Sequence, residues 1–302
     1  MIKIYLKIVA FSIPALIVVV FCCHNFSNGF IDYYYTKITN EGNSLIIGTS
    51  RASQGIIPDS VMVNTKFEGP MLNFAFSSFD SPFDEGYYNA IKSKLNEATK
   101  NGLFIIEVDP FALSSDDKSN LTSHTLKDQF IFHGTPNYEY LYRNVNPFYQ
   151  LIENRNFHDP SSILHKNGWL ELTLPMDSNS INSRANAKLK TLIKTIESSH
   201  LASNKIEYLE KTIEFLQAHG KVILIKIPAW PKIIEVENDY AEEIDKEVRK
   251  IAANKKVKYY DFTTKSNEYV YVDGNHLDKK SAIKFSAELN KLILENERTN
   301  IH

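Results

Sequence analysis

Short apolar runs alternate with longer amphipathic segments along most of this chain. Five runs have the length of buried strands, at residues 44–47, 71–76, 103–108, 221–227 and 257–262. Four segments have the spacing of one-sided helices, at residues 84–100, 204–218, 238–253 and 278–295. Strands that alternate with helices predict a parallel sheet with right-handed helical crossovers. We therefore predict an α/β fold built on a doubly wound, five-stranded parallel sheet.

The segment after the third strand departs from this rhythm. Residues 110–200 are rich in Asn, Ser, Asp, His and aromatic residues, with scattered prolines. So long a stretch inside an α/β domain is typical of an insertion, and its place after a strand favours a lid or a substrate-binding cap. We therefore predict one domain over residues 44–297, with the insertion at 110–200, and a short tail at 298–302.

The chain begins with a strongly apolar segment. Residues 4–23 read IYLKIVAFSIPALIVVVFCC, and Lys7 alone interrupts the apolar character. About 20 such residues form a helix that spans the hydrocarbon core of a bilayer. Lys3 and Lys7 lie at the N-terminal end, so the positive-inside rule places that end in the cytoplasm and the rest of the chain outside. We therefore predict a transmembrane signal anchor over residues 1–24, followed by a stalk over 25–43.

Three other interpretations of the apolar segment stay open. A cleaved signal peptide would need a small-x-small cleavage site, and none clearly follows the segment. A lipoprotein signal would use Cys22, but the residues before it, Val19, Val20 and Phe21, are bulky. The third interpretation is a buried helix of a soluble protein.

Composition excludes several classes of function. The 302 residues suffice for one domain with an appendage, and 43% hydrophobic with 23% charged residues is typical of a globular protein. The net charge of -2 argues against a nucleic-acid partner. Both cysteines lie in the apolar segment, the histidines form no ligand motif, and no glycine-rich phosphate loop is present. We therefore expect neither a metal nor a cofactor.

Two short motifs at opposite ends of the domain contain the candidate chemistry. Gly48-Thr49-Ser50 follows the first strand, and Asp273-Gly274-Asn275-His276 precedes the last helix. In a doubly wound sheet the site lies at the carboxyl ends of the strands, where both motifs are expected. Asp273 is spaced to hold His276 in one tautomer while the other ring nitrogen faces Ser50. The alternative for Ser50 is an ordinary helix N-cap.

This pair of motifs resembles the SGNH (GDSL-type) hydrolase superfamily, whose flavodoxin-like layout fits the five predicted strands. The resemblance implies that Ser50 is a nucleophile, His276 its general base and Asp273 the orienting acid. The variant Gly-Thr-Ser-Arg at residues 48–51, together with an N-terminal anchor, is similar to extracytoplasmic SGNH-like proteins linked to O-acylation of envelope glycans.

The oxyanion donors of that family are less evident in this chain. A glycine is usual after strand two, where residues 73–78 read NFAFSS, and Gly-x-Asn-Asp is usual after strand three, where residues 107–110 read EVDP. An ionised Asp109 would oppose an oxyanion, although it could hold Arg51 or bind a substrate hydroxyl. The candidates for oxyanion or substrate contacts are Arg51, Asn73, Ser77, Asp109 and Trp169.

Two of these candidates have structural alternatives. Arg51 could bind an anionic group through its planar fork, or it could pair with Asp109, Asp80 or Asp84. Trp169, in the insertion, could stack on a sugar ring, or it could belong to a small core.

Three functions are compatible with these observations. The first is an extracytoplasmic serine esterase or O-acyltransferase that acts on a cell-envelope glycan or a similar acylated carbohydrate. The second is a catalytically inactive SGNH-like domain that binds a glycan or assists a membrane acyltransferase, favoured by the absent Gly-x-Asn-Asp block. The third is a flavodoxin-like mononucleotide binder, for which no phosphate cradle is visible.

Overall fold

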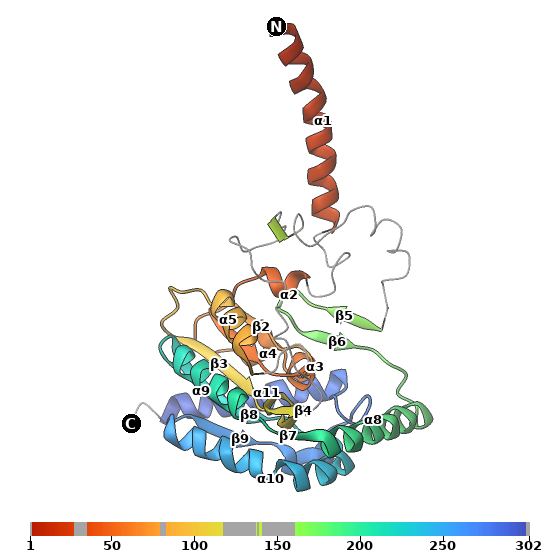
Figure 1. The fold of residues 1–302 in the computed structure, drawn as a ribbon, viewed down its shortest axis with the longest axis vertical. Helices are drawn as coiled ribbons and strands as arrows, with labels where there is room; N and C mark the ends of the chain where they lie inside the picture. Colours follow the sequence, from red (N-terminus) through yellow and green to blue (C-terminus); the bar gives the residue numbers. More distant parts are fainter. Residues whose placement is uncertain are drawn as a thin grey trace.

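The computed structural model describes residues 2–26, 35–78, 83–116, 137, 139–140 and 161–299 (Figure 1). Its helices are α1 (Ile2–Phe26), α2 (Tyr35–Thr39), α3 (Ser50–Gly55), α4 (Pro58–Val61), α5 (Glu85–Lys94), α8 (Ser178–Ser198), α9 (Ser203–Gln217), α10 (Pro231–Asn254) and α11 (Lys279–Thr299), with 3-10 turns η1 (Pro110–Leu113) and η2 (Thr263–Glu268). Its strands are β1 (Ser44–Ile47), β2 (Met71–Asn73), β3 (Gly102–Glu107), β4 (Ser114–Asp116), β5 (Ser162–Leu164), β6 (Leu170–Leu172), β7 (Ser199–Leu201), β8 (Gly220–Lys226) and β9 (Lys258–Asp261).

Five parallel strands form the central sheet in the order β2-β1-β3-β8-β9. Leu45 of β1 pairs with Phe104 of β3, which in turn pairs with Val222 of β8. Numbered along the chain this order is 2-1-3-4-5, the flavodoxin-like arrangement, in which the winding reverses between the first and third strands. The predicted α/β class and the five-stranded parallel sheet are confirmed. The reversal point lies between β1 and β3, where β1 leads into Ser50.

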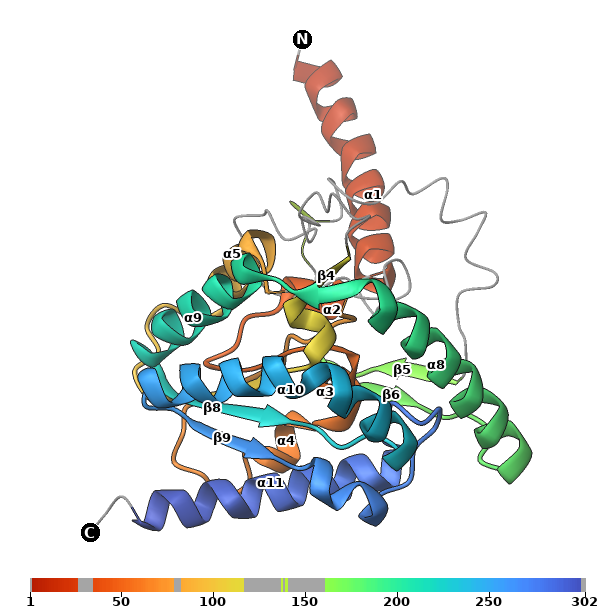
Figure 2. The ribbon, with the colours of Figure 1, turned by 60° about the horizontal axis from the view of Figure 1, so that its bottom comes forward.

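Helices cover both faces of the sheet (Figure 2). Leu45 and Ile47 face one core, which is covered by α5, α9 and α10, whereas Ile46 faces a second core covered by α3, α4 and α11. Because both faces are buried, the strands read as continuous apolar runs rather than as an alternation. This two-sided burial explains why the sequence pattern located β1, β2, β3 and β8. The edge strand β9, whose residues are exposed or half-buried, was located as well.

Several element boundaries differ from the prediction for local reasons. α5 ends at Lys94, before the predicted residue 100, because Gly42 accepts a hydrogen bond from the amide of Asn96 and donates one to the Lys94 carbonyl. These bonds turn the chain away from the helical path. α10 begins at Pro231 rather than at residue 238, since proline is well suited to the first turn of a helix.

The predicted stalk is wrong in its second half. Tyr35 and Ile38 of α2 are buried in the core beneath α5 and α9, at 1% and 4% exposure. Lys37 is buried as well, and its ammonium group donates to Ser53 Oγ at 3.0 Å and to the Ala75 carbonyl at 2.5 Å. Residues 35–43 therefore belong to the domain. The polar, tyrosine-rich composition of this segment concealed its buried face.

α1 extends away from the sheet (Figure 1). Within the described parts of the chain, no helix combines the length and the apolar character needed to cross a membrane. The structure thus gives no support to the membrane span predicted over residues 4–23, which rests on the sequence alone.

Described parts of the insertion pack against the domain. β4 pairs antiparallel with β7, which brings together the two ends of the insertion. β5 and β6 form an antiparallel hairpin, whose turn residue Asn167 accepts a hydrogen bond from the amide of Asn73 at the end of β2. α8 packs on α10. The predicted role as a lid or substrate-binding cap stays a prediction.

Candidate active site

β1 delivers Ser50 to the carboxyl edge of the sheet. Gly48 follows β1 with φ at +144°, and Thr49 is the N-cap of α3. A Cβ at Gly48 would lie 2.5 Å from Glu107 Oε2. Glycine therefore lets Glu107 approach and accept hydrogen bonds from Thr49 N at 2.7 Å and Thr49 Oγ1 at 3.1 Å. Since Thr49 occupies the cap position, the Ser50 hydroxyl is left for another partner.

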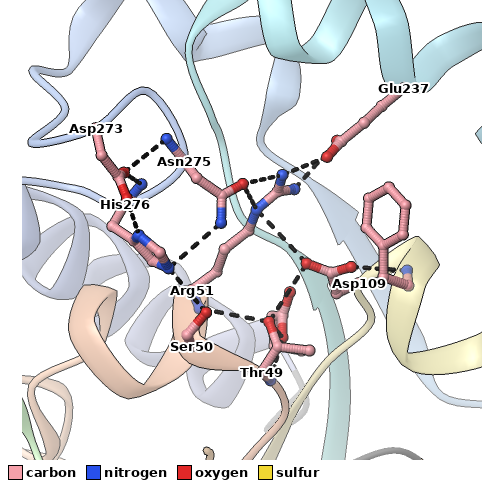
Figure 3. Close-up of polar contacts among 10 residues, drawn as sticks. Thr49, Ser50, Arg51, Asp109, Glu237, Asp273, Asn275 and His276 are labelled. Carbon is pink, nitrogen blue, oxygen red and sulfur yellow. Dashed lines mark hydrogen bonds and ion pairs between the residues drawn. The ribbon is translucent and has the colours of Figure 1, made fainter. Parts of the chain in front are cut away.

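That partner is His276, from the other end of the chain. His276 Nε2 lies 2.8 Å from Ser50 Oγ, and His276 Nδ1 lies 2.8 Å from Asp273 Oδ2 (Figure 3). A carboxylate accepts hydrogen bonds only, so Nδ1 carries the ring proton and Nε2 presents its lone pair to the serine hydroxyl. The three residues predicted from the motifs are thus brought together in the arrangement of a nucleophile, a base and an orienting acid.

Asp273 also holds the loop that carries the histidine. Its Oδ1 accepts the amides of Asn275 and His276, both at 2.9 Å, around Gly274, which has φ at +82°. Burial acts to raise the pKa of Asp273, but the hydrogen bond and charge of His276, with the two amides, outweigh burial and lower that pKa below its usual value. Asp273 is therefore ionised near neutral pH.

Two elements outside the motif hold this loop in place. Arg184 of α8 donates to the Val272 carbonyl at 2.7 Å, and the amide of Trp230, the N-cap of α10, donates to the Gly274 carbonyl at 2.7 Å. The insertion therefore contacts the loop that bears Asp273 and His276, and Trp230 lies beside it.

Arg51 is buried and bound on several sides. Its guanidinium contacts both carboxylate oxygens of Glu237, and its Nε lies 3.5 Å from Asp109. Its Nε and Nη2 donate to Asn275 Oδ1 at 3.0 Å and 2.6 Å. The structure therefore supports the ion-pair interpretation of Arg51, with Glu237 as a partner that the sequence did not predict. No nitrogen of this buried fork faces solvent as an anion receptor would require.

The carboxylates around Arg51 favour its charged form. Burial disfavours the charged guanidinium, but Glu237 and then Asp109 outweigh burial and hold the pKa of Arg51 above its usual value. Burial raises the pKa of Glu237 against the opposing effect of Arg51. The two direct contacts favour the charged pair, because breaking it would leave an uncompensated buried ion.

The side chains of Asn73 and Trp169 are bound within the domain, and the structure gives no support to their predicted substrate contacts. Asn73 is fully buried, its Nδ2 donates to the carbonyls of Ala52 and Ile56, and its Oδ1 accepts the amide of Ala75. Trp169 is 7% exposed and packs in the core beneath α3 and α11. Its indole N–H donates to the Gln54 carbonyl at 2.8 Å, which supports the core alternative.

Asp109 and Ser77 have different positions. Asp109 caps η1 by accepting the amide of Phe111, and its other oxygen lies 3.3 Å from Thr49 Oγ1 and near Arg51. It thus ties Arg51 in place, as one of its predicted alternatives proposed. Ser77 lies partly exposed beyond the end of β2 and stays a candidate.

Sequence reasoning gave no role to three residues of this cluster, Glu107, Glu237 and Asn275. A signal for Glu237 was present, since it is a charged residue on the helix face that also carries Ile233, Ile234, Ala241 and Ile244. The predicted helix began one residue too late to include it. Asn275 lies within the second motif, but only the fold places Arg51 beside it.

Neither the comparison with protein-family models nor the comparison with curated proteins gives a match to this chain. The resemblance to SGNH hydrolases therefore rests on the two motifs, and the function has to be argued from the geometry around Ser50.

Proposed function

We propose that this protein is an SGNH-like serine acyl hydrolase or O-acyltransferase. The observation that carries the proposal is the chain of two 2.8 Å contacts from Ser50 Oγ through His276 to Asp273. A serine hydroxyl is a weak nucleophile until an adjacent base removes its proton, and His276 Nε2 has the position and tautomer for that task.

The reaction proceeds in two steps. Ser50 Oγ attacks the acyl carbonyl carbon while its proton passes to His276 Nε2, and the departing alcohol then takes that proton to leave an acyl-serine. In the second step His276 Nε2 removes a proton from water or from a sugar hydroxyl, whose oxygen attacks the acyl carbon. The bond from the acyl carbon to Ser50 Oγ then breaks, and His276 returns the proton to Ser50 Oγ. Asp273 stabilises the imidazolium in both steps. Water yields hydrolysis, whereas a sugar hydroxyl yields transfer.

We propose an acylated cell-envelope glycan as the substrate, on the resemblance of residues 48–51 and 273–276 to envelope O-acylation proteins. Trp169 lends no support, because it is buried. Trp230 is the aromatic residue next to the His276 loop and is the better candidate for a sugar contact.

We propose that the domain lies outside the cytoplasmic membrane and is attached to it through residues 4–23. Lys3 and Lys7 flank the N-terminal end of the segment, and large apolar side chains of α1 are exposed, with Phe11 at 79% and Leu16 at 63%. A chain that lacks residues 1–26 should therefore no longer sediment with membranes. Unchanged sedimentation of this variant would contradict the proposal.

The test of the activity is labelling of the full chain with a fluorophosphonate probe, which phosphonylates activated serines. Wild type should label at Ser50, whereas Ser50→Ala should not label and His276→Ala should label far more slowly, by a factor of about 10⁴ or more. Asp278→Asn is the matched control, because Asp278 caps the start of α11 without touching Ser50 or His276.

Absence of labelling in a folded wild-type chain would contradict the enzyme. It would favour the second candidate, an inactive SGNH-like domain that binds a glycan or assists a membrane acyltransferase. The buried, committed state of Asn73 is the observation that favours this candidate, since it removes one of the predicted oxyanion donors.

A further inference from the structure

We propose that the side-chain amide of Asn275 donates a hydrogen bond to the oxyanion at this site. Arg51 is the positioning residue that orients this amide. The inference rests on the proposed acyl-transfer function. Asn275 Nδ2 lies 3.3 Å from His276 Nε2, the atom that also contacts Ser50 Oγ at 2.8 Å. An acyl carbonyl attacked by Ser50 would have to place its oxygen in this neighbourhood.

The orientation of the Asn275 amide is fixed by chemistry. A guanidinium has donors only, so the atom that faces Arg51 Nε and Nη2, at 3.0 Å and 2.6 Å, has to be the amide oxygen. The amide nitrogen must then point the other way. Figure 3 shows this nitrogen directed towards His276 and Ser50, on the side opposite to the guanidinium. A reversed amide would set two N–H groups against the N–H groups of Arg51.

Arg51 can hold this orientation because it is itself held. Its side chain is 1% exposed, that of Glu237 is 0% exposed, and Asp109 lies on a third side. A planar fork bound by two carboxylate oxygens has little freedom to rotate. The orientation of the Asn275 amide is therefore fixed before substrate binds. A donor that is fixed in this way can stabilise a transition state without first having to reorient.

The proton transfer itself would free the Asn275 donor. Neutral His276 Nε2 has one lone pair, and the Ser50 hydroxyl at 2.8 Å is closer to it than Asn275 Nδ2 at 3.3 Å. When Nε2 takes the serine proton, it becomes a donor and no longer attracts the Asn275 N–H. The acyl oxygen gains its negative charge in the same step. The Asn275 N–H can then donate to the acyl oxygen, which becomes a stronger acceptor as its negative charge develops.

Two of the other predicted candidates, Asn73 and Asp109, do not compete for this role. The Asn73 amide is fully used by backbone groups, and Asp109 is a carboxylate that would repel an oxyanion. Asn275, a residue with an exposed fraction of 7%, supplies a neutral N–H next to the reacting pair. A donor in such a water-poor position has a larger effect than one in bulk solvent.

The test uses the full chain and p-nitrophenyl acetate, and measures kcat, KM and the pH profile. Asn275→Ala should lower kcat by about 10²–10³ and change KM little, since the interaction forms only in the transition state. Asn275→Asp keeps the shape but replaces the donor with an acceptor, so its loss should be at least as large. The midpoint of the pH profile should be the same in both variants as in the wild type. Asn296→Ala, at a half-buried asparagine on α11 that donates to Tyr260, is the matched control.

The positioning role of Arg51 has a separate readout. Arg51→Lys keeps the charge but loses the fork, so it should lower kcat in the wild-type background and cause little further loss in the Asn275→Ala background. Additive losses would overturn the positioning role.

Failure of the inference and failure of the proposed function are distinguishable. If Ser50→Ala abolishes turnover while Asn275→Ala retains kcat within a factor of about three, the enzyme stands and Asn275 is not a donor. If the wild type shows no turnover that depends on Ser50, the proposed function fails and the assignment of Asn275 fails with it. Thermal unfolding of each variant separates a catalytic loss from a loss of folded protein.

Discussion

At the scale of single residues, Glu107 links the candidate site to the pH dependence of folding. Burial, and then the charge of Asp109, raise the pKa of Glu107 from 4.5 to about 8, against the hydrogen bonds from Thr49. The folded chain therefore holds a proton that the unfolded chain releases in this window. The free energy of unfolding should fall as pH rises from about 4.5 to about 8.

The variant Glu107→Gln should flatten this fall. Glutamine does not ionise, and its amide oxygen can accept the same two hydrogen bonds from Thr49. Urea unfolding at several pH values across the window measures the slope, with the exposed Glu242→Gln as control. If the slope is unchanged in Glu107→Gln, a group other than Glu107 binds the proton.

Asp273 has the opposite effect on the pH dependence of folding. Because its pKa is lowered in the folded chain, its ionised form stabilises the fold above pH about 3.8, and this stabilisation is lost as the pH falls further.

The three residues of the candidate triad were predictable one by one, but the residues that hold them in place were not. Ser50, Asp273 and His276 lie in short motifs whose spacing already indicates a nucleophile and an oriented base. The contact of Arg51 with Asn275 joins residues 224 positions apart, and local spacing contains no information about such a contact. Asn73 was a candidate because residues 73–78 stand where the resembling family has a glycine that binds the oxyanion, yet its side chain points inward and donates to two backbone carbonyls.

At the scale of secondary-structure elements, α10 contributes the counter-ion on which the site depends. Glu237 is fully buried and contacts Arg51 of α3 with both carboxylate oxygens, so it joins helices on opposite faces of the sheet. Glu237→Leu should destabilise the fold by about 3–5 kcal/mol, because it leaves the buried guanidinium with weaker partners.

The double variant Arg51→Met with Glu237→Leu should recover part of that loss, since no charge is then left uncompensated. Urea unfolding measures both effects. Glu247→Leu is the matched control on the same helix, because Glu247 pairs with Lys250 at the surface and should change stability by less than about 1 kcal/mol. A loss below 1 kcal/mol in Glu237→Leu as well would show that the buried pair contributes little.

Elements with two buried faces or a clear apolar stripe were predicted well, and elements defined by tertiary contacts were not. β1 was predicted at its observed residues because four apolar or small residues are followed by a glycine. α5 ended early because Gly42, distant in sequence, bonds to its last turn. α2 was missed because a five-residue helix offers too short a pattern to detect.

At the scale of the whole molecule, the packing of α2 moves the start of the domain from residue 44 to residue 35. The side chains of α1 at residues 3–19 are exposed, whereas Tyr35, Lys37 and Ile38 are buried. Two truncated chains separate these segments. Removal of residues 1–26 should leave the free energy of unfolding of the domain nearly unchanged. Removal of residues 1–43 should lower it by several kcal/mol, at about 1.5–3 kcal/mol for each large apolar side chain lost from the core.

The longer truncation should also affect the site, because Lys37 donates to Ser53 of α3, the helix that begins at Ser50. We therefore expect slower fluorophosphonate labelling of Ser50 in the chain that lacks residues 1–43, and wild-type labelling in the chain that lacks 1–26. Lys37→Met is the matched point variant, since it removes the two hydrogen bonds of Lys37 and keeps Tyr35 and Ile38 in the core. If both truncated chains have the same stability and the same labelling rate, residues 35–43 act as a stalk. The domain would then draw its stability from residues 44 onward alone.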